Sequence, residues 1–176
     1  MTERRTPLPE DTASFVGTLR ASTPRLFRVA LRLLGRRAEA EDAVQEGALK
    51  AFDAIASGRY DDRLAMESWL VAIVSRVAID MLRRRKVRGE ADAAIDPESV
   101  RWDTATDDQV GAAIEIGRWL AALPIDQRAA VVLKYFEGMT SREAAEVLGV
   151  SEGAVEQRLL RARAKLMGKD RDDDAG

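Results

Sequence analysis

The sequence predicts an all-α protein built from two small helical bundles. Ala, Leu, Arg and Glu dominate the periodic segments of both halves, and Val, Ile and Thr never alternate with polar residues for long. The segment 89–111 between the halves has no sustained apolar periodicity, which is typical of a linker rather than of a packed element. A chain of 176 residues is long enough for two small domains.

The first half should contain three helices. The first is expected over 25–34, because Thr23 is a good N-cap residue and Pro24 fits the first helical position. The second should run over 38–55 and the third over 66–85. Their apolar positions, which should form the core, are Val44, Ala48, Ala51, Phe52 and Ile55 in the second helix and Leu70, Ile73, Val74, Val77 and Met81 in the third, with Trp69 at the edge.

The second half should contain four helices, over residues 111–122, 125–136, 141–148 and 152–167. The sequence from Thr140 to Glu143 has the spacing of a capping box, which begins the third of these helices. Ala145, Gly149 and Val155 stand at the spacing of a helix-turn-helix, with a small residue at the crossing, a glycine in the turn and an apolar anchor. A plain helical hairpin is the alternative.

The net charge of −2 conceals an uneven distribution. Residues 1–88 carry a net charge of +5, residues 89–110 a net charge of −6, residues 111–169 a net charge of +2 and residues 170–176 a net charge of −3. Two basic blocks are therefore separated by an acidic segment. We expect an N-terminal tail over 1–13, a first domain over 14–88, a flexible acidic linker over 89–111, a second domain over 112–168 and an acidic tail over 169–176.

The absence of Cys and His excludes several classes of function. Without them the chain has no disulfide framework, no thiol or imidazole for catalysis and no zinc site of the ordinary kind. We therefore expect no enzymatic activity, no bound metal and no cofactor. No apolar run approaches the ~18 residues that a membrane-spanning helix needs, and the first ten residues are polar, so a cytoplasmic protein is expected.

One face of the 38–55 helix is acidic. At about 100° per residue, Asp42, Glu46 and Asp53 fall opposite the expected core, together with the apolar Leu49. Gln45 lies on the flank of this acidic face. An acidic surface that contains one apolar side chain suits the docking of a basic partner. An ordinary solvated helix face is the alternative.

The 66–85 helix carries a basic ridge on the side away from its expected core, formed by Ser75, Arg76, Ile79, Arg83 and Lys86. Five cations fall within residues 82–88, more than the helix dipole requires at about 0.3–1 kcal/mol per charge. Asp80 and Arg84, four residues apart, should form an ion pair. With Ile79 exposed among the cations, the ridge suits contact with phosphates and bases. A solvated basic helix end is the alternative.

The 152–167 helix should turn one face inward and one outward. The inward residues are Val155, Leu159, Ala162 and Leu166. The outward residues are Gly153, Gln157, Leu160, Arg161 and Ala164, with Ala154 and Arg158 beside them. The outward residues near the N-terminus of this helix are placed to contact base edges in a major groove. The cations further along could reach phosphates: Arg158, Arg161, Arg163 and Lys165.

Several segments together resemble one protein family. They are AEDAVQEGALKAF at 40–52, WL at 69–70, AIDMLRRR at 78–85, YFEGMT at 135–140 and EAAEVLGVS at 143–151. The chain is similar to bacterial sigma factors of the extracytoplasmic-function (ECF, group IV) type in the sigma-70 family, which keep only the second and fourth conserved regions. The resemblance implies a sigma2-like bundle and a sigma4-like helix-turn-helix.

The resemblance also implies three binding sites. The site for core RNA polymerase would comprise Asp42, Gln45, Glu46, Leu49 and Asp53. The site for the minus-ten promoter element, where relatives capture a flipped base in the loop 58–66, would comprise Arg59, Tyr60, Met66, Trp69, Arg76, Ile79, Asp80, Arg83, Arg84 and Lys86. The site for the minus-thirty-five element would comprise Ser151, Gly153, Ala154, Gln157, Arg158, Arg161, Arg163 and Lys165.

The implied partners are core RNA polymerase, promoter DNA and an anti-sigma factor, with the chain a monomer or a heterodimer with that factor and in no direct contact with a membrane. Three residues depart from the usual family pattern: Met66, Arg76 and Glu156. Two other functions compete with this interpretation. One is a helix-turn-helix regulator that does not recruit polymerase, and the other is a metal-dependent enzyme using Glu41, Asp42, Glu46 and Asp53.

Overall fold

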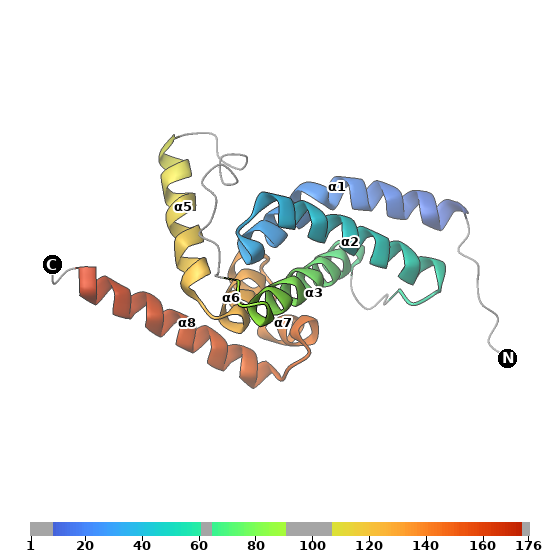
Figure 1. Cartoon of the computed structure of the whole chain (residues 1–176). Coiled ribbons are helices and arrows are strands. Elements are labelled where there is room, and N and C mark those ends of the chain that lie inside the picture. Colours follow the sequence, from blue (N-terminus) through green and yellow to red (C-terminus); the bar gives the residue numbers. More distant parts are fainter. Residues whose placement is uncertain (1–8, 61–64, 91–106, 174–176) are drawn as a thin grey trace.

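The structure is a computed structural model that describes residues 9–60, 65–90 and 107–173. All regular structure in these residues is helical, which confirms the predicted all-α class (Figure 1). The elements in chain order are α1 (Pro9–Leu34), α2 (Arg37–Ala56), α3 (Met66–Val87), α5 (Asp107–Ala122), α6 (Ile125–Val131), the π-helical segment η2 (Val132–Phe136), α7 (Ser141–Leu148) and α8 (Glu152–Asp173).

Helices α1, α2 and α3 pack against one another and form the first unit (Figure 1). Its α1 is much longer than the expected 25–34, and Pro24 lies inside it. Thr23 is therefore not an N-cap, and its Oγ1 donates to the Leu19 carbonyl at 2.8 Å within the helix. Phe15, in the turns before the proline, is fully buried. Packing of these earlier turns outweighs the hydrogen bond that a proline removes.

The face that α2 turns to the core differs from the expected one. Its buried residues are Ala40, Ala43, Gly47 and Ala51, whereas Phe52 is 48% exposed. A Cβ added to Gly47 would lie 2.6 Å from Cγ2 of Val74, so these two helices approach closely at this point. The stripe of small residues allows that approach, and it rotates the larger apolar residues of α2 toward its edges.

Helix α3 is buried around most of its circumference, because it contacts α1 and α2 on one side and α6 and α7 on the other. The expected core residues Leu70, Val74 and Val77 are buried. Ser75 and Ile79 were expected on the outward ridge and are buried as well, at 0% and 4% exposure. That prediction was wrong because a helix that contacts neighbours on two sides has no single apolar stripe.

Helices α6, α7 and α8, together with η2, form the second unit, which α5 precedes (Figure 1). The predicted capping box is confirmed: Thr140 Oγ1 accepts from the Glu143 N–H, and Glu143 Oε2 accepts from the Thr140 N–H at 2.7 Å. Gly149 ends α7 with φ 65°, a left-handed conformation that favours glycine. Ser151 caps α8, with its Oγ accepting from the Ala154 N–H at 3.2 Å.

The expected helix over 125–136 changes register along its length. Its second half is η2, in which the Glu137 N–H reaches the Val132 carbonyl at 3.1 Å. Most of the expected N-terminal tail and of the expected linker lies outside the described residues, although α1 extends back to Pro9 and α5 begins at Asp107. The expected C-terminal tail is wrong in part, because α8 continues to Asp173. Because α8 projects beyond the other helices (Figure 1), Leu166 is 41% exposed rather than buried as expected.

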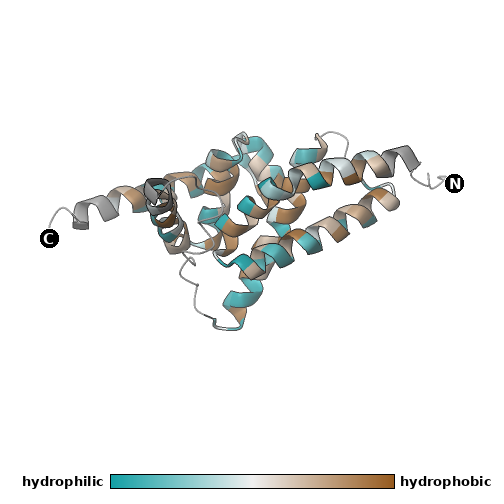
Figure 2. Ribbon diagram, turned by 90° about the horizontal axis from the view of Figure 1, so that it is seen from above, coloured by the Kyte–Doolittle hydropathy of each residue, from teal (hydrophilic) through white to brown (hydrophobic). Residues whose placement is uncertain are grey.

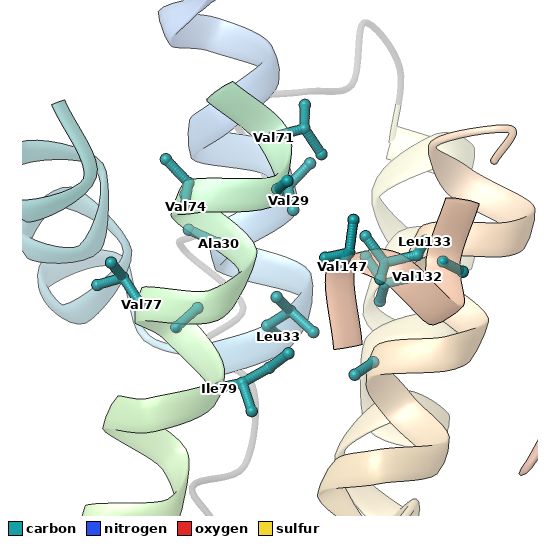
Figure 3. Close-up of a cluster of buried hydrophobic side chains, with 14 of the residues drawn as sticks. Val29, Ala30, Leu33, Val71, Val74, Val77, Ile79, Val132, Leu133 and Val147 are labelled. Carbon is teal, nitrogen blue, oxygen red and sulfur yellow. The ribbon is translucent and has the colours of Figure 1, made fainter. Parts of the chain in front are cut away.

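One apolar core joins the two units. Ile79 of α3 and Leu33 of α1 belong to the same buried cluster as Val132, Leu133 and Val147 of the second unit (Figure 3). Viewed from above in Figure 2, hydrophobic residues gather where the helices of the two units meet. The domains expected on either side of the linker are therefore packed against each other.

Candidate interaction surfaces

The acidic face of α2 is exposed as the sequence predicted. Asp42, Gln45 and Asp53 are exposed, and Leu49 exposes 69% of its surface among them. Glu46 is half-buried and pairs with Nζ of Lys50 at 2.8 Å. This pair joins two partly exposed side chains four residues apart and contributes at most a few tenths of a kcal/mol. The carboxylates of this face are thus available to a partner.

Phe52 adds an aromatic ring to the same surface, which the sequence had assigned to the core. It is 48% exposed and lies three residues from Leu49, and its ring centroid is 6.3 Å from that of Phe15. The apolar component of this surface is therefore larger than one leucine. The i, i+3 spacing of Leu49 and Phe52 was the signal that could have identified it.

A pocket of about 510 Å³ opens between the end of α2 and the middle of α3. Four residues predicted for the minus-ten element line it together: Arg59, Trp69, Arg76 and Asp80. The remaining lining residues are Lys50, Asp53, Ala54, Ile73 and Val77. The pocket therefore combines an indole, aliphatic side chains and charges of both signs, a lining that can stack on a planar group and bond to its edge.

Two further predicted residues flank Trp69 in the fold or in the sequence. The Tyr60 ring meets the Trp69 ring edge-on, with centroids 4.8 Å apart, which holds the indole in place. Met66 is half-buried at the first turn of α3. The loop expected to capture a base spans 58–66, and its residues 61–64 lie outside those described.

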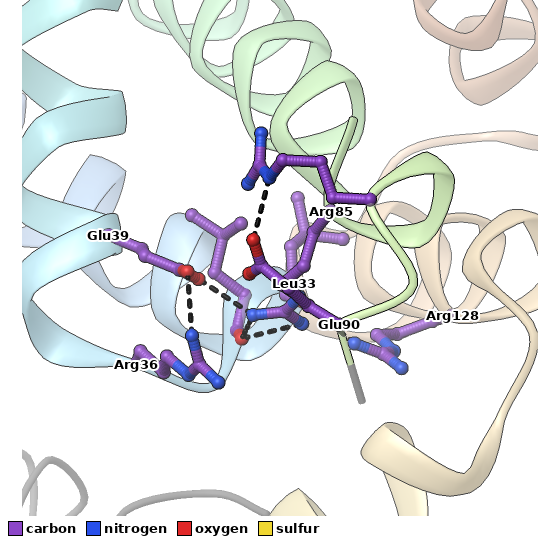
Figure 4. A network of polar contacts seen from close by, with 8 residues as sticks. Leu33, Arg36, Glu39, Arg85, Glu90 and Arg128 are labelled. Atoms are coloured by element: carbon purple, nitrogen blue, oxygen red, sulfur yellow. Dashed lines mark hydrogen bonds and ion pairs between the residues drawn. The ribbon is translucent and has the colours of Figure 1, made fainter. Parts of the chain in front are cut away.

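The basic run at the end of α3 divides into exposed and buried cations. Arg83, Arg84 and Lys86 are exposed, as a DNA-contacting role requires. Arg85 is 2% exposed, and its Nη1 lies 2.8 Å from Glu39 Oε2 and 3.4 Å from the Leu34 carbonyl (Figure 4). Arg85 therefore ties the three helix ends of the first unit together.

The ion pair of Asp80 also differs from the prediction. Its carboxylate lies 3.7 Å from Nη1 of Arg83, three residues along the helix, whereas Arg84 was expected as the partner. Both side chains are half exposed, so this contact contributes little to stability.

Helix α8 presents the expected outward face. Gly153, Gln157 and Arg161 are exposed, as are Ser151, Arg163 and Lys165, while Ala154 is half-buried. Val155 is fully buried and Ala162 is 1% exposed, which anchors the opposite face. Arg158 is less exposed than expected. Its side chain is 21% exposed, and its Nη2 lies 3.9 Å from Asp126 Oδ2 of α6.

Two residues that the sequence does not assign to the minus-thirty-five element are exposed on the same face of α8. Leu160 is 69% exposed, and Glu156 is exposed one turn before it. In α7, hydrogen bonds from the backbone and side chain of Thr140 lower the pKa of the Glu143 carboxyl. The ionised capping box therefore fixes the start of the helix-turn-helix at neutral pH.

Two predicted minus-ten residues contact the second unit. Arg76 donates from Nε to the Val147 carbonyl at 2.9 Å and from Nη2 to the Glu146 carbonyl at 3.0 Å, both in the last turn of α7. Arg83 Nη2 lies 3.5 Å from Asp126 Oδ1. Arg76 and its partners in α7 are about 70 residues apart in the chain, so no local pattern in the sequence could have predicted these contacts.

Comparison with known proteins assigns the family. The sequence matches the model of sigma-70 region 2 over residues 19–88 and that of sigma-70, region 4 over residues 113–166. It is 41% identical over 157 residues to the ECF RNA polymerase sigma factor SigM of Mycobacterium tuberculosis, covering 89% of this chain and 76% of SigM. This chain is an ECF sigma factor.

Other ECF sigma factors are similar to a comparable degree. SigL of Mycobacterium tuberculosis is 35% identical over 143 residues, which cover 76% of each chain. Among solved structures, CnrH in complex with the cytosolic domain of CnrY has a TM-score of 0.65 and 26% identity, with 92% of this chain and 90% of that chain covered. The sigma factor RpoE of Bartonella quintana, in complex with the anti-sigma factor NepR, has a TM-score of 0.66 at 24% identity, covering 92% and 96% of the two chains, and supports the fold.

The two family models fall on the two packed units of this ECF sigma factor. Region 2 corresponds to α1–α3 with the acidic face and the pocket, and region 4 corresponds to α5–α8 with the helix-turn-helix. No helix in the described part of the chain is both long and apolar enough to cross a membrane. Nor do the described residues gather three or more acidic side chains into a possible metal site, so Glu41, Asp42, Glu46 and Asp53 form a row rather than a ligand cluster.

Proposed function

We propose that this ECF sigma factor binds core RNA polymerase through α2 and recognises two promoter elements, one with each unit. The observation that carries the proposal is the convergence of Arg59, Trp69, Arg76 and Asp80 on one pocket of the region 2 unit. These residues come from two segments of the chain, and the family resemblance of the sequence implies each of them for the minus-ten element. The polymerase forms the bonds of the RNA chain, and the sigma factor recognises the promoter.

The polymerase site comprises Asp42, Gln45, Glu46, Leu49 and Asp53, to which we add Phe52. Carboxylates around an apolar centre suit a basic partner surface that also has apolar side chains. Leu49 and Phe52 expose large apolar surfaces that no other part of the described chain covers. They are the side chains from which most of the binding energy is expected, because apolar anchors dominate interfaces while rim charges set orientation.

The minus-ten site comprises the pocket and the cations around it. An unstacked base in the pocket could stack on Trp69 and bond to Arg76 or Asp80, while Arg59, Arg83, Arg84 and Lys86 meet phosphates. Tyr60 supports the indole from the loop side, and Met66 is half-buried three residues before Trp69. Ile79 is buried in this structure, so it belongs to the site only when the second unit moves away from α3.

The minus-thirty-five site is the exposed face of α8 in a major groove. Ser151, Gly153, Ala154 and Gln157 lie at the N-terminal end, where a recognition helix meets base edges. Arg158, Arg161, Arg163 and Lys165 lie further along and suit phosphates. Arg161→Ala is expected to weaken binding to all sequences alike and to lower the salt slope of log K by about 0.9, the contribution of one phosphate contact.

We also propose regulation by an anti-sigma factor. The structure of the Bartonella quintana relative in complex with NepR supports this proposal, as does the acidic linker expected over 89–111. The chain would then act in the bacterial cytoplasm as a monomer or as a heterodimer with that factor. Because it has no Cys and no His, any redox or zinc sensing must lie in the partner.

Run-off transcription tests the proposed function. Core RNA polymerase is incubated with fragments of the source genome, with and without the purified chain. Discrete start sites that depend on the chain are expected, and their upstream sequences define both promoter elements. Binding to DNA without association with polymerase would instead support the helix-turn-helix regulator.

The same assay separates the three sites. Leu49→Ala should reduce transcription from every promoter, because it weakens binding to polymerase. Trp69→Ala should reduce opening at the minus-ten element while binding to polymerase is retained. Arg161→Ala should reduce affinity for a duplex that carries only the minus-thirty-five element. A variant that affects all three readouts equally would indicate loss of folding rather than loss of one site.

A further inference from the structure

We propose that Ser57, at the end of α2, is a positioning residue for the minus-ten site. It holds Arg59 so that the outer edge of the guanidinium meets the phosphate beside the base that enters the pocket. The inference rests on the proposed function of this pocket and deepens it, because Ser57 belongs to none of the expected binding sites. Arg59 lines the pocket and Ser57 does not, so Ser57 acts through Arg59.

The backbone at the end of α2 sets the direction in which the chain leaves the helix. Gly58 has φ 67°, a left-handed conformation that favours glycine. The Gly58 N–H donates to the Ile55 carbonyl at 3.0 Å, and the Arg59 N–H donates to the Ala54 carbonyl at 2.7 Å. These two bonds form a Schellman motif. Because Ala54 and Arg59 both line the pocket, the motif is part of the pocket wall.

The Ser57 hydroxyl restrains the side chain of Arg59. Its O–H donates to the Asp53 carbonyl, four residues earlier in α2, and its oxygen accepts from Nε of Arg59 at 2.7 Å. A hydroxyl has one proton, so when that proton is bonded to the helix end, the lone pairs of the oxygen are left for Arg59. The end of α2 therefore determines where the guanidinium is held.

The bond from Nε leaves the outer edge of the guanidinium for a ligand. Nε carries one of the five N–H groups of an arginine, and Nη1 and Nη2 carry the other four. Two parallel N–H groups on that edge match two oxygens of a phosphate. Arg59 is thus restrained on the side that DNA does not need.

The value of this bond lies in geometry rather than in stability. Ser57 and Arg59 are both exposed, and a hydrogen bond between exposed side chains adds little to the free energy of unfolding. An unrestrained arginine samples many rotamers, and immobilising such a side chain on binding weakens affinity by about two- to tenfold. Because Ser57 restricts Arg59 before DNA arrives, most of this loss is avoided. Tyr60 restricts Trp69 in a similar way, with ring centroids 4.8 Å apart, so the segment 57–60 preorganises two lining side chains.

The first test measures the order of Arg59 in the free, full chain. NMR relaxation of the arginine Nε–H groups reports this order directly. We expect the Nε–H of Arg59 to be ordered in the wild type and in Ser57→Thr, which keeps a hydroxyl, and mobile in Ser57→Ala. An Arg59 that is equally mobile in the wild type and in Ser57→Ala would overturn the proposal.

Thr23→Ala is the matched control. Thr23 is exposed in α1, and its Oγ1 donates to the carbonyl four residues earlier, that of Leu19, as Ser57 does in α2. It does not line the pocket. The order of Arg59 should be the same in Thr23→Ala as in the wild type.

The second test is a double-mutant cycle in the holoenzyme. The factor is bound to core RNA polymerase and titrated with a fluorescent forked promoter, in which the minus-ten element mapped by run-off transcription is single-stranded. Arg59→Ala should weaken binding by about tenfold or more, and Ser57→Ala by about two- to tenfold. In the Arg59→Ala background, Ser57→Ala should change Kd by less than about twofold. Ser57→Thr and Thr23→Ala should bind like the wild type.

Losses that multiply in the double variant would overturn the proposal, because Ser57 would then act on DNA itself or on the folding of α2. An unchanged Kd in Arg59→Ala would overturn it as well. Failure of the wild type to start transcription with core polymerase would instead overturn the proposed function, so the two failures are distinguishable.

Discussion

Arg85 reaches across the first unit from the end of α3 to Glu39 in the first turn of α2, with Nη1 2.8 Å from Oε2. The same guanidinium bonds to the Leu34 carbonyl at the end of α1, and Arg36 reaches the other carboxylate oxygen of Glu39 at 3.2 Å (Figure 4). The side chain of Arg85 is 3% exposed and that of Glu39 24%. A basic run that looks uniform in the sequence therefore has two functions, and only its exposed members are available to DNA.

Replacing Arg85 by alanine should destabilise the first unit. The change leaves Glu39 and the Leu34 carbonyl without this charged donor, and breaking a buried pair typically costs about 3 kcal/mol. Urea unfolding of the full chain measures the free energy. Arg84→Ala is the control, since Arg84 is exposed on the next position and its loss should change stability by less than about 0.5 kcal/mol. Equal effects of the two variants would contradict the structural role of Arg85.

Gly47→Ala should destabilise the chain although alanine is the better helix former. The added Cβ would lie 2.6 Å from Cγ2 of Val74, so α2 and α3 must move apart, at a cost of about 1–3 kcal/mol. Gly17→Ala in α1 is the matched control, because nothing lies within 4 Å of its added Cβ. That control should be stabilising by up to about 1 kcal/mol. The loss in Gly47→Ala should shrink when Val74 is also replaced by alanine.

Leu49→Ala should weaken binding to core RNA polymerase without loss of stability. Leu49 is 69% exposed in the acidic face of α2, and truncation of an apolar anchor costs about 2 kcal/mol, or roughly thirtyfold in Kd. Val87→Ala is the control, an 88% exposed aliphatic residue at the end of α3. Affinity is measured by titrating labelled factor with core polymerase. A loss of equal size in both variants would argue against a specific site on α2.

Glu156→Gln should change which base pair is preferred in the minus-thirty-five element. Glu156 is exposed on α8 beside Gln157, and a carboxylate in a major groove accepts from the amino group of cytosine. Loss of that contact should remove about 1–3 kcal/mol of discrimination at one position. Transcription from promoters that differ at single base pairs measures the preference. Glu152→Gln, in the first turn of α8, is the control and should leave the pattern unchanged.

The capping box of α7 should make stability depend on pH in the acidic range. Hydrogen bonds from Thr140 lower the pKa of Glu143 below its ordinary value of 4.5, so the ionised carboxyl stabilises the fold at any pH above that value. This stabilisation is lost as the pH falls through the lowered pKa. Glu143→Gln should therefore cost about 0.5–1 kcal/mol at neutral pH, and the difference from wild type should disappear in acid. Glu146→Gln, exposed on the same helix, is the control and should change stability by less than about 0.5 kcal/mol.

Local sequence determined the helix-turn-helix and the acidic face of α2. The capping box, Gly149 and Ser151 lie within a dozen residues of one another, and each acts on the backbone next to it, so their positions in the helix-turn-helix were predictable. The acidic face of α2 was also predictable, because helical periodicity places charges opposite an apolar face whatever the helix packs against.

Tertiary structure decided which face each helix buries and which cations remain available. Periodicity indicates that α3 has an apolar side, but it contains no information on a second neighbour, and α6 and α7 cover Ile79 and bind Arg76 from the other side. The core face of α2 follows from the close approach at Gly47, and the burial of Arg85 follows from three helix ends that meet. These properties depend on residues far apart in the chain, because burial is set by the neighbours of a side chain in space and not by its neighbours in sequence.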